Sequence, residues 1–467
     1  MNFRRTKVIH FVGIGGVGMS GIAEVLLTLG YQVTGSDIAE NARIRNLRRR
    51  GGKISIGHSV NNLTAADVVV KTSAVDENNC EIQEAHRKNI PVIPRAEMLA
   101  ELMRLKQGIA VAGTHGKTTT TAMVSVVLQS GGFDPTVVVG GRMHNLGIGA
   151  RLGSDDQIVV EADESDGSFL KLTPVLAVVT NIENDHMDYY GNMQEVEAAF
   201  KQFINSVPFY GFVALCGDCP RIRNLLAGVH KPFVTYGLGE HNQLRAYDLE
   251  NKNFTTKFKV ERDGKFIGEI NLPLPGKFNV QNALAALAIG MEKGMDFNAV
   301  RAGLESFEGV ARRFDLKGRV NDFTVYDDYA HHPTEIEKTL QAAAENLEGE
   351  LLVVFQPHRY SRTRDLADEF GHALKFDGKL CVTEIYPAGE EQIAGIDIEF
   401  LKNKILPHRN GSQTEFAVGR EKILDWVEKQ IEPGKKQFLF TMGAGNIVSL
   451  AEPILDRAMK KIGARET

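Results

Sequence analysis

The sequence predicts an α/β protein of three domains: a Rossmann-like N-terminal domain, a central P-loop domain with an antiparallel edge, and a Rossmann-like C-terminal domain. Two glycine-rich turns, each lying between an apolar strand and a helix, predict the first two domains. Strands and helices alternate again after residue 314. The chain has 467 residues, too many for one hydrophobic core. We place the domains at residues 1–106, 107–313 and 314–467.

Composition excludes several classes of protein. Apolar residues make up 43% and charged residues 24%, as in an ordinary soluble globular chain. The net charge of −5 argues against a nucleic-acid partner, and no segment is long and apolar enough for membrane insertion. The 4 cysteines are sparse, and Cys216 and Cys219 form a lone C-x-x-C, so reduced thiols fit better than structural zinc. We expect a cytoplasmic monomer or homodimer.

The N-terminal domain opens with a nucleotide-type turn. The strand Lys7–Val12 leads through Gly13–Gly18, a G-x-G-x-x-G turn, into the helix Met19–Leu29. A second strand ends at Asp37, where a ribose-binding carboxylate belongs. Ser73 follows a third strand and is either a helix cap or a ligand contact. Any nucleoside diphosphate would suit this helix N-terminus, so the turn alone does not specify NAD.

The central domain opens with a second turn of a different kind. The strand at 109–112 runs through the loop at 113–116 into a helix at 119–128. The loop glycines allow successive N–H groups to converge, Lys117 adds positive charge, and Thr118 places a hydroxyl where magnesium would bind. The first glycine stands later than in the usual G-x-x-x-x-G-K-[ST] motif. The pattern nevertheless predicts a site for a nucleoside triphosphate.

Two later strands of this domain end in acidic loops. The strand Gln157–Glu161 delivers a carboxylate at its end, and residues 162–166 carry more acids. Residues 181–188 follow the next strand and contain Asn181, Asp185, His186 and Asp188. A carboxylate at a strand end beside a phosphate site suits magnesium. His186 is either a metal or phosphate contact or a satisfied structural histidine.

The remainder of the central domain carries weaker signals. The loop Gly140–Gly149 is rich in glycine and polar residues, as functional loops often are. Residues 212–272 show short alternating strands separated by turns, which predicts the antiparallel edge. Asn279 and Asn282 precede a predicted helix at Ala283–Gly290, where they would serve as caps or contact adenine.

In the predicted C-terminal domain, basic side chains follow the ends of two strands. The segment Glu308–Phe314 is a predicted hinge, so we expect a site that is assembled by domain closure. His331 and His332 follow the strand at 323–326; neighbouring histidines chelate poorly, which favours substrate contacts over zinc. Two arginines follow the strand at 350–355 and suit a carboxylate or phosphate.

Together these motifs resemble the Mur ligase family of peptidoglycan synthesis. The matching segments, in the family's order, are residues 9–24 (IHFVGIGGVGMSGIAE), 112–120 (AGTHGKTTT), 161–166 (EADESD), 180–188 (TNIENDHMD), 327–333 (DDYAHHP) and 357–360 (PHRY). They span nearly the whole chain and are specific jointly, although each alone is not. The resemblance is closest to the branch of the family that adds L-alanine.

The resemblance implies an ATP-dependent amide-bond ligase. ATP would phosphorylate the lactoyl carboxylate of UDP-N-acetylmuramate to an acyl phosphate. The amine of L-alanine would attack it, and a tetrahedral intermediate would collapse to an amide, ADP and phosphate. The implied cofactors are ATP and two Mg²⁺ ions, with Mn²⁺ as a substitute.

The resemblance also implies roles for individual residues. The catalytic residues would be Lys117, His186, Arg313 and His331. ATP would contact Gly113, Thr114, His115, Gly116, Lys117, Thr118, Thr119, Asn279, Asn282, Arg313 and Asp328. Metal ligands would be Thr118, Glu161 and His186. The UDP substrate would contact Gly13, Gly15, Gly16, Gly18, Ser36, Asp37, Ser73 and His115. The amino acid would contact Tyr329, His331, His358, Arg359 and Arg362.

One segment departs from other branches of the family. Ligases that add later residues carry a carbamylated lysine in a segment ending E-A-A-K, whereas this chain has Phe200 there, followed by Lys201. The second magnesium must therefore be held otherwise, which fits the alanine-adding branch. Three alternatives remain: a ligase that recycles murein tripeptide, an NAD-dependent dehydrogenase, and a non-catalytic ATP-binding switch protein.

Overall fold

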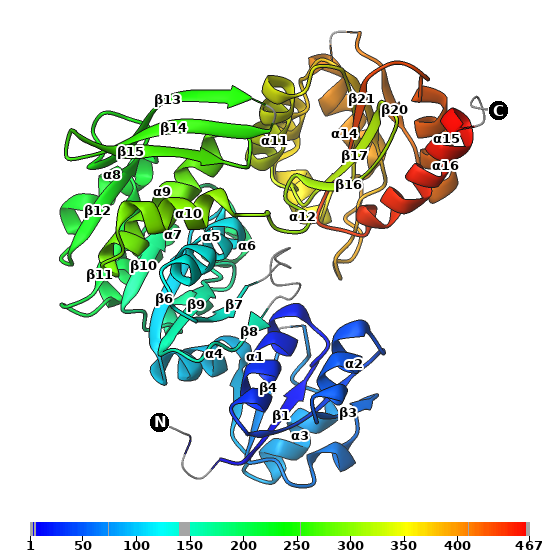
Figure 1. The fold of residues 1–467 in the computed structure, drawn as a ribbon. Helices are drawn as coiled ribbons and strands as arrows, with labels where there is room; N and C mark the ends of the chain where they lie inside the picture. Colours follow the sequence, from blue (N-terminus) through cyan, green and yellow to red (C-terminus); the bar gives the residue numbers. More distant parts are fainter. Residues whose placement is uncertain are drawn as a thin grey trace. The chain divides into compact units, whose positions relative to one another are not determined.

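The computed structural model describes residues 3, 6–72, 74–139, 150–252, 254–409 and 411–463. These residues form three sheets covered by helices, which confirms the α/β class (Figure 1). The chain clusters into two compact units. The first comprises Met1–Glu250, Lys257–Pro273 and Asn279–Glu308, and the second Asn251–Thr256, Leu274–Phe278 and Gly309–Thr467. The predicted three-domain boundaries stay a prediction.

The first sheet has five parallel strands in the order β3-β2-β1-β4-β5. The strands are β1 (Val8–Val12), β2 (Gln32–Asp37), β3 (Lys53–Ile56), β4 (Val68–Lys71) and β5 (Val92–Pro94), and the helices α1 (Val17–Thr28), α2 (Ala42–Arg49), α3 (Cys80–Arg87) and α4 (Arg95–Arg104). Ile9 and Phe11 of β1 are fully buried. Because every strand is parallel, the segments that follow β1, β2 and β3 meet at one edge of the sheet.

The second sheet has ten strands in the order β15-β14-β13-β12-β11-β10-β6-β9-β7-β8. They are β6 (Gln107–Ala112), β7 (Thr136–Val138), β8 (Ala150–Arg151), β9 (Gln157–Glu161), β10 (Leu176–Val179), β11 (Phe212–Cys216), β12 (Phe233–Gly237), β13 (Leu244–Lys252), β14 (Thr255–Arg262) and β15 (Lys265–Leu272). The two-residue turn Asp263–Gly264, with positive φ at both residues, makes β14 and β15 a hairpin. This confirms an antiparallel edge at β14 and β15, but the predicted start at residue 212 is wrong, because β11 and β12 pair in parallel with their neighbours.

Helices bury the centre of this second sheet. They are α5 (Lys117–Ser130), α6 (Met187–Tyr190), α7 (Met193–Ser206), α8 (Pro220–Leu225), α9 (Lys277–Glu292) and α10 (Phe297–Glu305). Helix α5 is buried continuously from Thr119 to Leu128. A Cβ at Gly303 of α10 would lie 2.9 Å from Val127 Cα, so glycine permits the close crossing of α10 and α5.

The third sheet has the order β16-β17-β21-β18-β19-β20, and only β16 is antiparallel to its neighbour. Its strands are β16 (Asp315–Val320), β17 (Phe323–Asp328), β18 (Glu350–Phe355), β19 (Lys379–Val382), β20 (Thr414–Phe416) and β21 (Gln437–Met442). Its helices are α11 (Pro333–Asn346), α12 (Tyr360–Asp365), α13 (Ala367–Ala373), α14 (Ile398–Ile405), α15 (Arg420–Gln430) and α16 (Ala451–Gly463).

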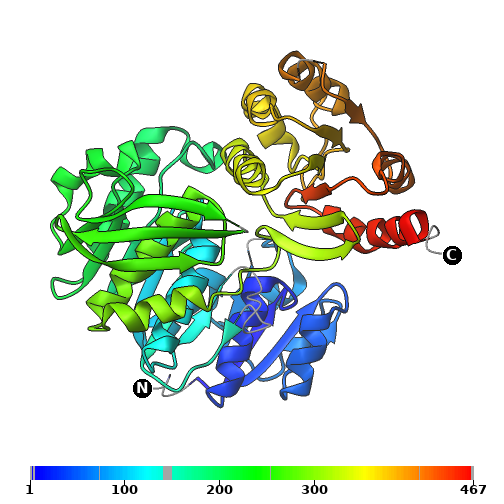
Figure 2. The same ribbon diagram turned by 45° about the horizontal axis from the view of Figure 1, so that its top comes forward.

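Helices cover both faces of this sheet. Leu351 and Val353 of β18 pack into a core with α11 and α13, whereas Leu352 and Val354 pack into a second core with α15 and α16. Figures 1 and 2 show α11 and the red helix α16 on opposite sides of the strands. The period-two alternation along β18 therefore makes this part doubly wound. Among the helices described, none is both long and apolar enough to span a bilayer.

Candidate active site

The loop between β6 and α5 forms the predicted phosphate cradle. Gly113 and Gly116 both have positive φ, of 137° and 80°. A Cβ at Gly113 would lie 2.0 Å from Thr180 Oγ1, so only glycine fits there. Helix α5 begins at Lys117 rather than at the predicted position 119, and no side chain caps its N-terminus. Its first N–H groups are therefore available to an anion.

The loop after β10 clamps this cradle. The Asn181 side chain accepts a hydrogen bond from His115 N at 2.8 Å and donates one to His115 O at 3.0 Å. Thr180 Oγ1 also donates to His115 O at 2.6 Å, and Thr114 Oγ1 accepts from Glu183 N at 2.9 Å. The sequence predicts that Asn181 lies near the site but does not predict this role, because the contact joins segments 66 residues apart.

Lys117 is held inside the cradle by an acid that was not among the predicted site residues. Its Nζ donates to Gly113 O at 2.7 Å and lies 2.7 Å from Glu164 Oε2. Burial opposes the ammonium charge, but the carboxylates of Glu164, Asp163 and Glu161 outweigh burial and raise the pKa of Lys117. Burial raises the pKa of Glu164 to about 7, against the attraction of Lys117. The ammonium is thus charged and poised beside the loop.

The predicted metal ligands Thr118 and Glu161 lie together. Thr118 Oγ1 donates to Glu161 Oε1 at 2.9 Å, at the start of α5. His186 Nε2 lies 3.7 Å from Glu164 Oε1 and 3.6 Å from Asp185 Oδ2. Hydroxyl and carboxylate oxygens at a phosphate cradle are the donors that Mg²⁺ prefers, so Thr118 and Glu161 fit the ion. The side chain of Asp188 lies outside the described residues.

The pair Asn279 and Asn282 lies inside α9, so the expectation that they cap a helix is wrong. The helix begins at Lys277 and not at the predicted Ala283, and both asparagines are buried. Asn282 Nδ2 donates to Asn279 Oδ1 at 3.4 Å. A Cβ at Gly116 would lie 2.8 Å from Asn282 Oδ1, which places this amide against the cradle. Their position favours the alternative of a nucleotide contact.

The N-terminal glycine turn is held by the end of β2. Gly15 N donates to Asp37 Oδ2 at 2.7 Å, while Gly13 N and Ile14 N donate to Ser36 O at 2.9 and 3.0 Å. Gly16 caps α1 without a side-chain hydrogen bond. The predicted residues Gly13, Gly15, Gly16, Gly18, Ser36 and Asp37 therefore lie together. Ser73 and the loop Gly140–Gly149 lie outside the described residues.

Arg95 was not predicted and lies over this turn. A Cβ at Gly18 would lie 3.1 Å from the Arg95 guanidinium. The same guanidinium is 3.3 Å from Asp163 Oδ2 in the loop after β9. Arg95 follows β5 directly. Its position after the apolar residues of this short strand is the signal that could have identified it from the sequence.

In the second unit, two arginines flank Tyr329. Arg312 lies 4.8 Å and Arg313 5.2 Å from the centre of the Tyr329 ring. Arg312 Nε pairs with Asp327 at 3.1 Å, and Arg313 Nη1 pairs with Glu335 at 3.3 Å. Burial raises the pKa of Asp328 to about 6, against the charge of Arg313 and two backbone N–H donors.

The predicted amino-acid contacts form a row of rings and cations. The Tyr329 and His331 ring centres are 5.1 Å apart, and those of His331 and His358 are 5.7 Å apart. Tyr386, which was not predicted, stacks on His358 at 5.6 Å. Arg359 Nε pairs with Glu390 at 2.8 Å, and the charge of Arg362 acts on both histidines. Among the described residues, His358 Nδ1 is buried without a hydrogen-bond partner.

Strained backbone marks several of these segments. His186, Arg312, Phe314 and Arg359 are non-glycine residues with positive φ, of 58°, 63°, 51° and 70°. Such conformations cost roughly 1–3 kcal/mol each and persist where surrounding contacts determine them. Each lies in a segment that the sequence assigns to the site or its hinge.

The two histidines of the second unit predict a pH-dependent stability. Burial lowers the pKa of His331 to about 3 and that of His358 to about 4. Below pH 6.5 these two histidines bind protons in the unfolded chain but stay neutral in the folded chain. The free energy of unfolding therefore decreases as the pH falls from 6.5 toward the pKa values of the folded state. The loss should reach about 1.4 kcal/mol per pH unit for each histidine. Urea unfolding between pH 7 and 5 measures it.

The matched variant for this experiment is His331→Asn/His358→Gln. It removes both titrating groups, and its unfolding free energy should therefore fall less steeply with pH than that of the wild type. Equal slopes for the two proteins would contradict the assignment of neutral, half-buried imidazoles.

The residue at the carbamate position belongs to a hydrophobic core. Phe200 of α7 is fully buried and packs edge-on against Phe169, with the ring centres 5.2 Å apart. Phe169 in turn stacks on Phe203 at 5.1 Å. No carbamate can form at an aromatic side chain, and Lys201 beside it is exposed.

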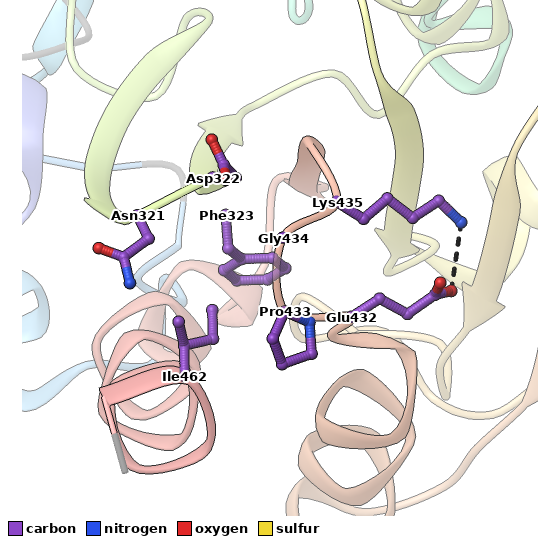
Figure 3. Close-up of a pocket in the computed structure, with 8 residues that line it drawn as sticks. All are labelled: Asn321, Asp322, Phe323, Glu432, Pro433, Gly434, Lys435 and Ile462. Atoms are coloured by element: carbon purple, nitrogen blue, oxygen red, sulfur yellow. Dashed lines mark hydrogen bonds and ion pairs between the residues drawn. The ribbon is translucent and has the colours of Figure 1, made fainter. Parts of the chain in front are cut away.

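A separate pocket of about 280 Å³ lies in the second unit (Figure 3). It is lined by Asn321, Asp322, Phe323, Glu432, Pro433, Gly434, Lys435 and Ile462. All of these residues except Ile462 of α16 lie just before β17 or β21 or at the start of β17, so the pocket lies at the amino ends of these strands. Ligands of open α/β sheets bind at the carboxyl ends, and the pocket contains none of the predicted site residues.

Three family models match consecutive parts of the chain. Residues 8–107 match the catalytic domain of the Mur ligase family, residues 111–290 the Mur ligase middle domain, and residues 312–445 the Mur ligase glutamate ligase domain. The chain belongs to the Mur ligase family. The resemblance predicted from the sequence motifs is therefore confirmed.

Similar proteins match this Mur ligase along its whole length. A UDP-N-acetylmuramate–L-alanine ligase of Geotalea daltonii is 50% identical over 455 residues, which are 97% of this chain and 99% of the relative. The crystal structure of a UDP-N-acetylmuramate–alanine ligase from Thermotoga maritima has a TM-score of 0.81 and 32% identity, covering 97% of this chain and 99% of that one. A murein peptide ligase from Psychrobacter arcticus shares the fold, at 24% identity and a TM-score of 0.71, covering 97% and 98%.

Proposed function

We propose that this Mur ligase is an ATP-dependent, ADP-forming ligase that joins L-alanine to the lactoyl carboxylate of UDP-N-acetylmuramate. The observation that carries the proposal is the 50% identity, over 97% of the chain, to a relative named for this reaction. This is the first amino-acid step of peptidoglycan stem-peptide synthesis. A reaction that consumes ATP and a UDP-linked sugar suits the cytoplasm.

The chemistry asks for positioning and charge neutralisation more than for covalent catalysis. Phosphoryl transfer from ATP to a carboxylate brings two anions together, and the resulting acyl phosphate is the electrophile for the amine of alanine. Lys117 would leave Glu164 and Gly113 O to contact the transferring phosphoryl group. Thr118, Glu161 and His186 would hold magnesium, which supplies further positive charge on the phosphates when bound. The free N–H groups at the start of α5 would bind the phosphates of ATP.

The remaining site residues divide by the units that carry them. In the first unit, Asn279 and Asn282 would contact ATP, and the glycine turn with Asp37 would bind the UDP group. In the second unit, Tyr329, His331, His358, Arg359 and Arg362 would contact the amino acid, and Arg313 and Asp328 the nucleotide. A carboxylate suits the arginines because guanidinium groups bind it bidentately.

Phe200 supports the alanine-adding branch. With an aromatic residue where other branches carry a carbamylated lysine, the second magnesium would rely on His186 and the acids near it. The murein tripeptide ligase is the second candidate, because a murein peptide ligase shares the fold.

The deciding experiment measures phosphate release from ATP in the presence of UDP-N-acetylmuramate. L-alanine, glycine, L-serine and the murein tripeptide are tested separately, at equal concentrations and with magnesium present. We expect L-alanine to stimulate release most strongly. If none of the four compounds stimulates phosphate release, the ligase proposal is wrong. If the murein tripeptide stimulates it most strongly, the protein is a recycling ligase instead.

A further inference from the structure

A buried acid connects three segments around the first sheet: strand β1, strand β2 and the residues that follow β3. Glu81 lies in the first turn of α3 and is fully buried. One carboxylate oxygen accepts from Ser36 Oγ at 2.5 Å and lies 3.3 Å from His10 Nε2. The other accepts from Ser59 N at 3.0 Å and Asn62 Nδ2 at 2.6 Å. These donors outweigh burial and lower the pKa of Glu81 to about 2, so it is ionised at neutral pH.

The hydroxyl group of Ser36 therefore has no hydrogen left to donate to another group. Its single proton is donated to Glu81, and its side chain is fully buried. His58 Nδ1 lies 2.9 Å from the same oxygen, which has no second proton to give. His58 must then donate its Nδ1–H to Ser36. In the neutral ring this leaves Nε2 as a hydrogen-bond acceptor.

His58 is the member of this cluster that reaches the surface. Its side chain is 19% exposed, whereas those of His10 and Glu81 are fully buried. Only Gly57 separates His58 from the end of β3, and Gly57 N donates to Asp37 O at 2.8 Å. Within the described part of the chain, Nε2 of His58 has no hydrogen-bond partner, although every other polar side-chain atom of the Glu81–Ser36–His58 chain is engaged.

From this arrangement we infer that His58 binds the uridine of the UDP substrate by accepting a hydrogen bond at Nε2, and that Glu81 is a positioning residue that acts through Ser36. The inference rests on the proposed function, because it assigns a contact to that substrate. A uridine offers two kinds of donor to such an acceptor, the ribose hydroxyls and the N3–H of uracil. Ser36, which was predicted to contact the substrate, then acts through His58 instead.

The test is calorimetric titration of the full-length protein with UDP. His58→Ala should weaken UDP binding on the order of tenfold, the cost of one lost hydrogen bond in a binding site. The KM for ATP and for L-alanine should stay unchanged. Wild-type protein should also bind one of 2′-deoxy-UDP, 3′-deoxy-UDP or 3-methyl-UDP more weakly than UDP, and His58→Ala should not discriminate that analogue. The sensitive analogue identifies the donor.

A double-mutant cycle tests the role of Glu81. Glu81→Gln should weaken UDP binding roughly three- to tenfold, and the double variant Glu81→Gln/His58→Ala should bind within about twofold of His58→Ala alone. A purely structural role would instead make the two losses add. Glu84→Gln, on the same helix but paired with Arg87 and Lys88 instead of the Ser36 cluster, is the matched control and should bind UDP like the wild type.

The outcomes separate this inference from the proposed function. Normal UDP binding by His58→Ala, or wild-type protein that discriminates none of the analogues, would overturn the inference alone. If Glu81→Gln does not fold, the single His58 variant still decides the contact. Wild-type protein that fails to bind UDP, together with no amine-stimulated phosphate release, would overturn the proposed substrate and the inference with it.

Discussion

Lys117→Ala is expected to abolish ligase turnover while UDP binding persists. Lys117 is the cation inside the phosphate cradle, and its Nζ already lies 2.7 Å from Gly113 O and from Glu164 Oε2. Without it, the charge that develops on the transferring phosphoryl group loses its preorganised partner. Loss of such a group lowers kcat by at least roughly 10²- to 10³-fold. Phosphate release with saturating substrates measures the loss.

Two observations control this prediction. Lys201→Ala removes an exposed lysine from α7 and should leave kcat unchanged. The N-terminal glycine turn does not include Lys117, so titration of Lys117→Ala with UDP should give the wild-type affinity. If UDP binding disappeared together with turnover, the assignment of the two nucleotides to different turns would be wrong.

Glu161→Ala should have the second largest effect, through magnesium. Glu161 ends β9 and accepts from Thr118 Oγ1 at 2.9 Å, so it is in direct contact with the hydroxyl group that is predicted to bind the metal. Its removal leaves one hard oxygen fewer for the ion. We expect turnover to fall on the order of 10²-fold at saturating ATP, as for the loss of one preorganised electrostatic contact. The magnesium concentration that supports half-maximal activity should rise.

The matched control lies in the same loop. Asp166→Asn replaces an acid whose Oδ1 accepts from Ser168 N at 3.0 Å and which does not contact Thr118. Its magnesium dependence should follow the wild type. Binding of Mn²⁺, followed by its paramagnetic resonance in the presence of ADP, gives a readout that does not depend on turnover. An unchanged metal affinity in Glu161→Ala would remove this residue from the ligand set.

Local patterns were sufficient for much of the fold. The apolar runs that became β1, β6, β9 and β18 were predicted within two residues of their observed bounds, because each is a buried strand bounded by turn residues. Helix starts were predicted too late at both Lys117 and Lys277. Polar residues that open these helices carry no apolar periodicity. The short strands β3 and β5 were missed because three or four residues show no clear alternation.

In the candidate site, too, contacts between sequence neighbours were predicted and contacts between distant segments were not. Lys117, Thr118 and the glycines of the cradle are neighbours in sequence, so strand–turn–helix geometry alone predicts that they converge. Contacts such as Glu164 on Lys117 and Asn282 beside Gly116 join segments far apart in the chain. No local pattern specifies which of several acids in residues 161–166 turns toward the lysine.

By itself, the sequence determined the order of the motifs, the family and the two strand–turn–helix units that we propose bind phosphate, because these depend on short-range backbone geometry. Only the tertiary structure decided what holds those turns. Asn181 holds the loop between β6 and α5, and Arg95 lies over the N-terminal glycine turn. Glu81 accepts the hydroxyl hydrogen of Ser36, so that His58 must donate to Ser36 through Nδ1. Each of these contacts joins segments that only the packed chain brings together, and the fully buried Glu81, removed from water, must find its partners there.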